Sequence, residues 1–159
     1  MKKIVFTLLF LIAAIPSSFA QLRTHSFEEV ERLSKENPKP IVVFIHTSWC
    51  KYCKMMENST FKNPAVIKEL NENFYFISLD AESKKEITFN NHAFRFRPTG
   101  IASGVHELAT ALATIGNRVV YPTLVVLDAN YTILLQKPSY LNAKALLSIL
   151  EKKEINPYF

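Results

Sequence analysis

Residues 41–45 form an uninterrupted apolar run, and two cysteines separated by two residues, Cys50 and Cys53, follow it closely. An apolar run rich in β-branched residues predicts a strand that is covered on both faces. The next stretch predicts a helix over residues 50–58, so Cys50 would lie at its N-terminus. Unpaired amides and the helix dipole favour a thiolate there. The chain is therefore expected to carry a buried strand that leads directly into a reactive cysteine pair.

The other predicted elements alternate between helices and strands. Ser26 and Glu29 are expected to form a capping box that opens a helix ending near Asn37-Pro38, and Asn63 with Pro64 opens another. Apolar patterns predict strands over residues 74–79, 123–127 and 131–135, the last two as a hairpin, and a closing helix over residues 141–152. This order predicts an α/β domain with a mixed sheet.

A long excursion separates the second and third predicted strands, from residue 80 to residue 119. Its first half, to about residue 104, is polar and is expected to be irregular. Within it, residues 94–98 alternate Phe and Arg, which fits either a short edge strand or a partner-binding lip. The second half predicts a helix over residues 105–115. Loops of this length are usually functional or disordered.

The N-terminal twenty residues predict a secretory signal peptide. Lys2 and Lys3 precede an apolar run over residues 4–15, and small residues at Ser18 and Ala20 suit cleavage after Ala20. The alternative, a membrane anchor, needs a run of about 20 residues. Residues 21–159 are then one domain in the periplasm or outside the cell. A formal charge of +5 without a long basic cluster does not indicate nucleic-acid binding.

The spacing of the cysteines suits thiol–disulfide exchange, in which Cys50 attacks a disulfide and Cys53 resolves the mixed disulfide. A c-type haem site is excluded because Lys54, and not a histidine, follows the second cysteine. Structural zinc needs four ligands, and no second cysteine pair is present. Two alternatives stay open: Cu(I) held by two thiolates, with or without His46, and a purely structural disulfide.

Trp49-Cys50-Lys51-Tyr52-Cys53-Lys54 after an apolar strand, with Tyr121-Pro122-Thr123 before a hairpin, resembles the thioredoxin superfamily. The resemblance implies a thioredoxin-like fold, in which helices flank a central mixed β-sheet. It also implies a cis bond before Pro122, whose neighbouring backbone binds substrate. Relative to that family, the chain is expected to carry an insertion at about residues 81–104, before the proline. Residues 50–80 resemble the soluble domain of periplasmic thiol:disulfide interchange proteins more than cytosolic thioredoxin.

The sequence also departs from that family. The family carries a buried acid six residues before the first cysteine, where this chain has Phe44. Glu57, four residues after Cys53, is the candidate to deprotonate Cys53, or else an exposed helix glutamate that pairs with a lysine. His46 is expected to be a structural histidine at the end of its strand. Besides the catalytic Cys50, Cys53 and Glu57, the resemblance implies substrate-binding roles for Trp49, Lys51, Tyr52, Tyr121 and Pro122.

The expected function is a periplasmic or secreted disulfide reductase or exchange catalyst that acts on protein disulfides. Neither a cofactor nor a metal is expected, and a membrane electron donor of the interchange-protein type would reduce the cysteine pair. The alternatives are a net disulfide oxidase or isomerase, and a non-enzymatic Cu(I) metallochaperone.

Overall fold

The computed structural model describes residues 21–152 and residue 155, and its centre is a four-stranded sheet in the order β10-β9-β1-β2. Strand β1 (Ile41–His46) pairs in parallel with β2 (Tyr75–Asp80) and antiparallel with β9 (Thr123–Leu127). Strand β10 (Ile133–Lys137) completes the sheet antiparallel to β9. The predicted mixed sheet is confirmed, with the strand before the cysteines at its centre.

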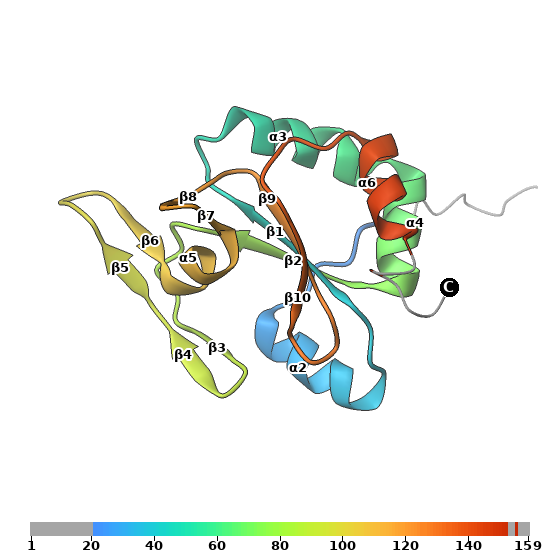
Figure 1. Cartoon of the computed structure of the whole chain (residues 1–159), viewed down its shortest axis with the longest axis horizontal. Helices are drawn as coiled ribbons and strands as arrows, with labels where there is room; N and C mark the ends of the chain where they lie inside the picture. The colour runs from blue at the N-terminus through green and yellow to red at the C-terminus, as the bar shows by residue number, and fades with distance from the viewer. Residues whose placement is uncertain (1–20, 153–154, 156–159) are drawn as a thin grey trace, which may run out of the picture.

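Helices cover both faces of this sheet (Figure 1). On one face lie α2 (Phe27–Glu36) and α5 (Glu107–Ala113). On the other lie α3 (Lys51–Asn58), η1 (Thr60–Lys62), α4 (Pro64–Asn73) and α6 (Ala143–Leu150). Because both faces are covered, the central strands β1 and β9 are buried along almost their whole length, which explains their continuous apolar runs. Among the described residues, no helix is both long and apolar enough to cross a membrane.

Two predicted helix starts are confirmed by their capping bonds. The Ser26 hydroxyl accepts a hydrogen bond from the amide of Glu29 at 3.1 Å and opens α2. The Asn63 side chain accepts from the amides of Ala65 and Val66 at 3.0 and 3.3 Å and opens α4. Each bond supplies a partner to amides that lack one in the first helical turn.

The first half of the excursion is not irregular, so that prediction was wrong. Strands β3 (Ile87–Phe89) and β4 (His92–Phe94) form one hairpin, and β5 (Phe96–Pro98) and β6 (Gly104–His106) form a second. Asn90 and Asn91 both have positive φ angles, 51° and 58°, as a tight two-residue hairpin turn requires. Within residues 94–98, Phe94 ends β4 and residues 96–98 form β5, so this stretch is paired except at Arg95, as the edge-strand interpretation expected.

Glutamates of α2 hold the first hairpin against the domain. The carboxylates of Glu28 and Glu31 accept hydrogen bonds from the backbone amides of Thr88 and Asn90 at 3.2 and 2.6 Å. The predicted helix follows as α5, and a small hairpin of β7 (Thr114–Ile115) and β8 (Arg118–Val119) leads back to the sheet. The second hairpin projects from the body of the molecule beside this helix (Figure 1).

The C-terminal elements agree with the sequence except at their ends. Strand β9 has the predicted bounds, whereas β10 begins at Ile133 and not at residue 131. Tyr131 has a φ of 68°, so it belongs to the turn and cannot continue an extended strand. Helix α6 begins after Asn142, whose side chain accepts from the amide of Ala145. The predicted signal peptide, residues 1–20, lies outside the described residues.

Candidate active site

Cys50 and Cys53 form a disulfide at the N-terminus of α3, with their Cα atoms 5.2 Å apart. Cys50 is the N-cap of the helix, and its sulfur accepts a hydrogen bond from the amide of Cys53 at 3.2 Å. Cys50 keeps 6% of its surface exposed, whereas Cys53 has none. The helix amides therefore favour negative charge at the outer sulfur, while the inner sulfur is shielded from solvent.

Local hydrogen bonds fix the path from the strand to the cysteines. The amide of Cys50 donates to the carbonyl of Thr47 at 3.3 Å, and the amide of Lys54 donates to the carbonyl of Cys50 at 3.1 Å. Strand β1 ends at His46, so only three residues separate the sheet from the disulfide. The central strand thus places the disulfide at its own C-terminal end.

The bond between Tyr121 and Pro122 is cis, as the resemblance implied. It lies directly before Thr123, which pairs with Ile45 of β1. Tyr121 packs against the buried cluster that contains both cysteines. The predicted proline loop and the cysteine pair therefore meet at one end of the sheet.

Trp49 stands beside the disulfide with 64% of its surface exposed. Its ring meets that of Tyr121 edge to face, with ring centres 5.9 Å apart. Its indole N–H donates to the carboxylate of Glu82 at 3.1 Å. These two contacts hold a large aromatic side chain in a fixed position while most of its surface stays open to a partner.

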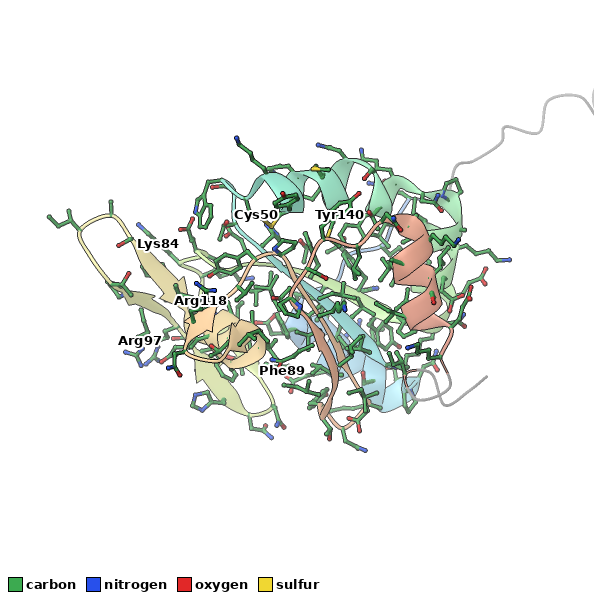
Figure 2. All side chains as sticks on the ribbon, turned by 45° about the horizontal axis from the view of Figure 1, so that its top comes forward. Cys50, Lys84, Phe89, Arg97, Arg118 and Tyr140 are labelled. Carbon is green, nitrogen blue, oxygen red and sulfur yellow. A yellow bond between two sulfur atoms is a disulfide. The ribbon has the colours of Figure 1, made fainter. Side chains whose placement is uncertain are left out.

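A second exposed aromatic, Tyr52, follows Cys50 in the first turn of α3. Tyr52 is 60% exposed, and its ring centre is 6.3 Å from that of Tyr140. Figure 2 shows Cys50 and Tyr140 at the same end of the molecule. Lys51 is also exposed. The predicted substrate-binding residues Trp49, Lys51, Tyr52, Tyr121 and Pro122 thus surround or adjoin the disulfide, and their role stays a prediction.

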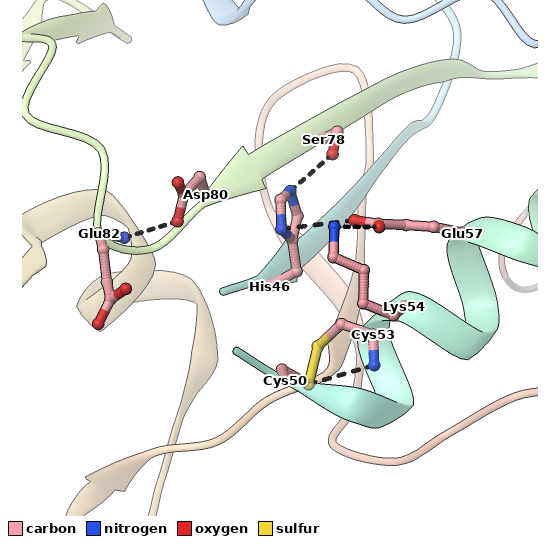
Figure 3. Close-up of polar contacts among 8 residues, drawn as sticks. All are labelled: His46, Cys50, Cys53, Lys54, Glu57, Ser78, Asp80 and Glu82. Carbon is pink, nitrogen blue, oxygen red and sulfur yellow. Dashed lines mark hydrogen bonds and ion pairs between the residues drawn. A yellow bond between two sulfur atoms is a disulfide. The ribbon is translucent and has the colours of Figure 1, made fainter. Parts of the chain in front are cut away.

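Glu57 lies one turn after Cys53 and contacts two basic side chains (Figure 3). One carboxylate oxygen accepts from the Lys54 ammonium at 2.9 Å, and the other lies 3.7 Å from Nδ1 of His46. The predicted pairing of Glu57 with a lysine is therefore present, and the Glu57 carboxylate also lies close to His46 at the end of β1. Its role as the base for Cys53 stays a prediction.

The side chain of His46, at the end of β1, is largely buried. Its Nε2 lies 2.9 Å from the hydroxyl of Ser78, within hydrogen-bond distance. Burial lowers the pKa of His46, Lys54 lowers it further, and the negative charges of Glu57 and Asp80 partly oppose that shift. His46 is consequently neutral at pH 7.

Two contacts of this site were not predicted from the sequence. Glu82, the partner of Trp49, begins the excursion and lies 33 residues from the tryptophan. Ser78, the partner of His46, is the one exposed residue within the apolar strand β2. The serine at position 78 interrupts an apolar run and could have indicated a polar contact there, whereas nothing in the sequence indicated a role for Glu82. Among the described residues, no three His, Cys, Asp or Glu side chains form a group suited to a metal ion.

The sequence model of the thioredoxin-like domain family matches residues 27–154, nearly the whole described chain. The chain belongs to the thioredoxin-like family. Solved thioredoxin-like structures share its fold: an oxidoreductase named DsbH aligns with a TM-score of 0.62 at 21% identity, over 91% of this chain and 90% of that one. A thioredoxin from Thermus thermophilus aligns with a TM-score of 0.57 at 20% identity, over 82% and 85%.

Curated sequence relatives of this thioredoxin-like chain match little more than a third of it. Spermatogenesis-associated protein 20 of Mus musculus is 37% identical over 60 residues, which is 38% of this chain and 8% of the relative. The thiol:disulfide interchange protein DsbD of Campylobacter jejuni is 30% identical over 56 residues, 35% of this chain and 10% of the relative. The chain therefore spans about a tenth or less of the length of these curated relatives.

Ionisation of Tyr121 is expected to weaken the fold at high pH. Burial raises the pKa of Tyr121 to about 12, and Glu82 and Asp80 reinforce the shift. The unfolded chain ionises this phenol near pH 10. The contribution of Tyr121 to the free energy of unfolding is therefore fully present below pH 10 and is lost as the pH rises toward 12. The Tyr121→Phe variant should match the wild type at pH 8 and lose less stability at pH 11, measured as urea unfolding midpoints.

Tyr75 and Tyr131 also have raised pKa values because of burial, and they remain in the variant as an internal reference. An equal loss of stability in the variant and the wild type between pH 8 and pH 11 would contradict the effect assigned to Tyr121.

Proposed function

We propose that this chain is a thiol–disulfide oxidoreductase that reduces or exchanges disulfides of other proteins through Cys50 and Cys53. The observation that carries the proposal is the asymmetry of the pair: an outer sulfur at a helix N-terminus and an inner sulfur with no exposed surface. A purely structural disulfide does not need this asymmetry. The thioredoxin-like family and the cis-proline loop beside the pair support the same chemistry.

The reaction starts from the reduced pair. The Cys50 thiolate attacks one sulfur of the substrate disulfide, forms a mixed disulfide and releases the other substrate sulfur as a thiolate. Cys53 then loses its proton and attacks Cys50, which releases the second substrate thiolate and re-forms the Cys50–Cys53 disulfide. Two electrons pass from the chain to the substrate, and a donor dithiol must return them.

The direction of transfer and the location are part of the proposal. The name of the interchange protein DsbD and the predicted signal peptide support a reductase or exchange catalyst in the periplasm or outside the cell, fed by a membrane donor. Redox potential distinguishes this role from that of a net oxidase, because thioredoxin-like and strongly oxidising pairs differ by about 150 mV. Equilibration of the pair with glutathione buffers measures it.

Replacing Cys53 by serine is expected to trap the partner. The variant can still attack through Cys50, but it cannot resolve the mixed disulfide, so covalent complexes should accumulate. Dithiothreitol should cleave these complexes by reducing the mixed disulfide. Non-reducing electrophoresis after expression in the native host detects them. The matched control is the double variant Cys50→Ser/Cys53→Ser, which should trap nothing.

Two outcomes would contradict the exchange mechanism. One is a Cys53→Ser variant that forms no more adducts than the double variant. The other is tight binding of Cu(I) by the reduced wild type together with no reduction of insulin, which would instead indicate the metallochaperone alternative.

A further inference from the structure

Strand β1 places an aromatic ring, Phe44, six residues before Cys50, and a histidine, His46, two residues further along. Side chains alternate along a strand, so Phe44 and His46 lie on the same face of β1. Their rings stack with centres 5.2 Å apart and an angle of 19° between the planes. Phe44 packs in the buried cluster that contains both cysteines. On this face of β1 the titratable side chain is therefore that of His46, which lies two residues closer to the disulfide than Phe44.

The two ring nitrogens of His46 have different surroundings. Nε2 is bonded to Ser78, whereas Nδ1 is buried and has no hydrogen-bond partner among the described residues. Nδ1 faces the Glu57 carboxylate at 3.7 Å, slightly beyond hydrogen-bond distance. With the ring proton on Nε2, the lone pair of Nδ1 opposes the lone pairs of that carboxylate. A proton between the two groups removes this repulsion.

The charges around His46 keep it ready to accept a proton. Glu57 and Lys54 face it from α3, and Asp80 faces it from β2. Burial and Lys54 lower the pKa of His46, and the two carboxylates oppose them without cancelling the shift. Because imidazole is neutral at pH 7 under these conditions, it can take up a proton in a catalytic cycle. A histidine already charged at pH 7 could not.

We propose that His46 positions Glu57 and shares a proton with it, so that the pair takes up the proton that Cys53 releases during disulfide exchange. Glu57 lies four residues after Cys53 on the same face of α3, and His46 acts through Glu57 (Figure 3). This inference rests on the proposed oxidoreductase function. It assigns to His46 a role beyond the structural one that the sequence suggested.

The step balances within the exchange reaction. The proton of the Cys53 thiol passes to the His46–Glu57 pair, and the Cys53 thiolate attacks Cys50 and displaces the substrate thiolate. A groove of about 640 Å³, lined in part by Glu57, Ser78 and Phe44, opens beside the pair. Water in this groove can then carry the proton to solvent or to the departing thiolate.

The test follows the single tryptophan, Trp49, which adjoins Cys50 and whose fluorescence is expected to change when the neighbouring disulfide is reduced. Reduced protein is mixed with oxidised glutathione in a stopped-flow instrument from pH 5 to pH 9. At high glutathione concentration the attack is fast, and the plateau rate measures resolution by Cys53. His46→Gln should lower this plateau at least about tenfold at pH 7 and move the acid limb to lower pH, because Glu57 alone is a weaker base.

His25→Gln is the matched control. His25 forms another histidine–glutamate pair, with Nδ1 3.0 Å from the carboxylate of Glu29, and that pair belongs to the α2 side of the sheet. This variant should keep the wild-type rates and pH profile. The double variant His46→Gln/Glu57→Gln should be no slower than the slower single variant, because the two residues act as a unit.

A second measurement does not depend on turnover. NMR of the imidazole protons in wild-type protein, oxidised and then reduced with dithiothreitol, should show the His46 midpoint rising on reduction, because a thiolate nearby favours the imidazolium. The His25 midpoint should stay constant. Ser78→Ala, which removes only the Nε2 partner, should weaken this response without abolishing it.

The outcomes separate the inference from the proposed function. An unshifted pH profile in His46→Gln, with or without a uniform drop in rate, would overturn the proton role and leave His46 a structural residue. So would an identical His46 midpoint in the two redox states. A redox-dependent midpoint together with no reaction of the wild type with any disulfide would overturn the oxidoreductase function while the coupling of His46 to the cysteines stood.

Discussion

Replacing Cys50 by serine is expected to lower the rate of protein-disulfide reduction by at least about a thousandfold, to the uncatalysed level. Cys50 supplies the outer sulfur, and its place as the N-cap of α3 is what favours the thiolate. Serine can still cap the helix, so the fold should persist, but its hydroxyl does not ionise at neutral pH. Reduction of insulin by dithiothreitol, followed as turbidity, measures the loss.

The matched control for this variant is Met55→Ser, which introduces serine at an exposed position of the same helix. It should reduce insulin at close to the wild-type rate. A Cys50→Ser variant that kept more than about a hundredth of the wild-type rate would show that Cys50 is not the attacking group. Thermal unfolding of both variants under reducing conditions checks that each is folded.

Placing an acid at position 44, as Phe44→Asp, is expected to destabilise the domain by at least about 4 kcal/mol. The Phe44 side chain is 1% exposed, and its ring packs against those of Phe61 and His46. The substitution leaves a cavity and places a carboxyl group in apolar surroundings. Urea unfolding at pH 8 measures the loss.

The loss of stability in Phe44→Asp should also increase with pH. Burial would raise the pKa of the new carboxyl in the folded state, so its cost is smaller below pH 4 and grows as the pH rises toward neutrality. Phe44→Leu, which keeps an apolar side chain, should lose less than about 2 kcal/mol at any pH. A stability of Phe44→Asp close to that of Phe44→Leu at pH 8 would mean that this site tolerates a buried charge.

The predictable parts of the fold were those determined by short stretches of sequence. The apolar run before the cysteines, the caps at Ser26 and Asn63 and the hairpin strand β9 all depend on neighbouring residues, and the structure has them as predicted. The cysteine pair and Pro122 were also recognisable, because each belongs to a local motif.

The hairpins of the excursion were missed because their strands are too short to show a pattern. Strands β3 and β4 have three residues each, and distant contacts stabilise them, such as the bond from the Thr88 amide to Glu28, 60 residues away. The Asn90-Asn91 turn was the one local signal. The relation of His46 to Glu57 was hidden for the same reason, since it depends on how α3 packs over β1.

Trp49 touches both ends of the excursion: Glu82 at its beginning and Tyr121 just beyond its end. The exposed residues of the hairpins β3–β4 and β5–β6 can change without altering the register of the four central strands, because the chain leaves from β2 and returns into β9 at the end of the sheet that carries the disulfide. Insertions and deletions in the hairpins would thus remodel the neighbourhood of Trp49 while the cysteines kept their geometry. Under the proposed function, divergence of partner choice among related chains is expected to concentrate in these hairpins, with the cysteine pair unchanged.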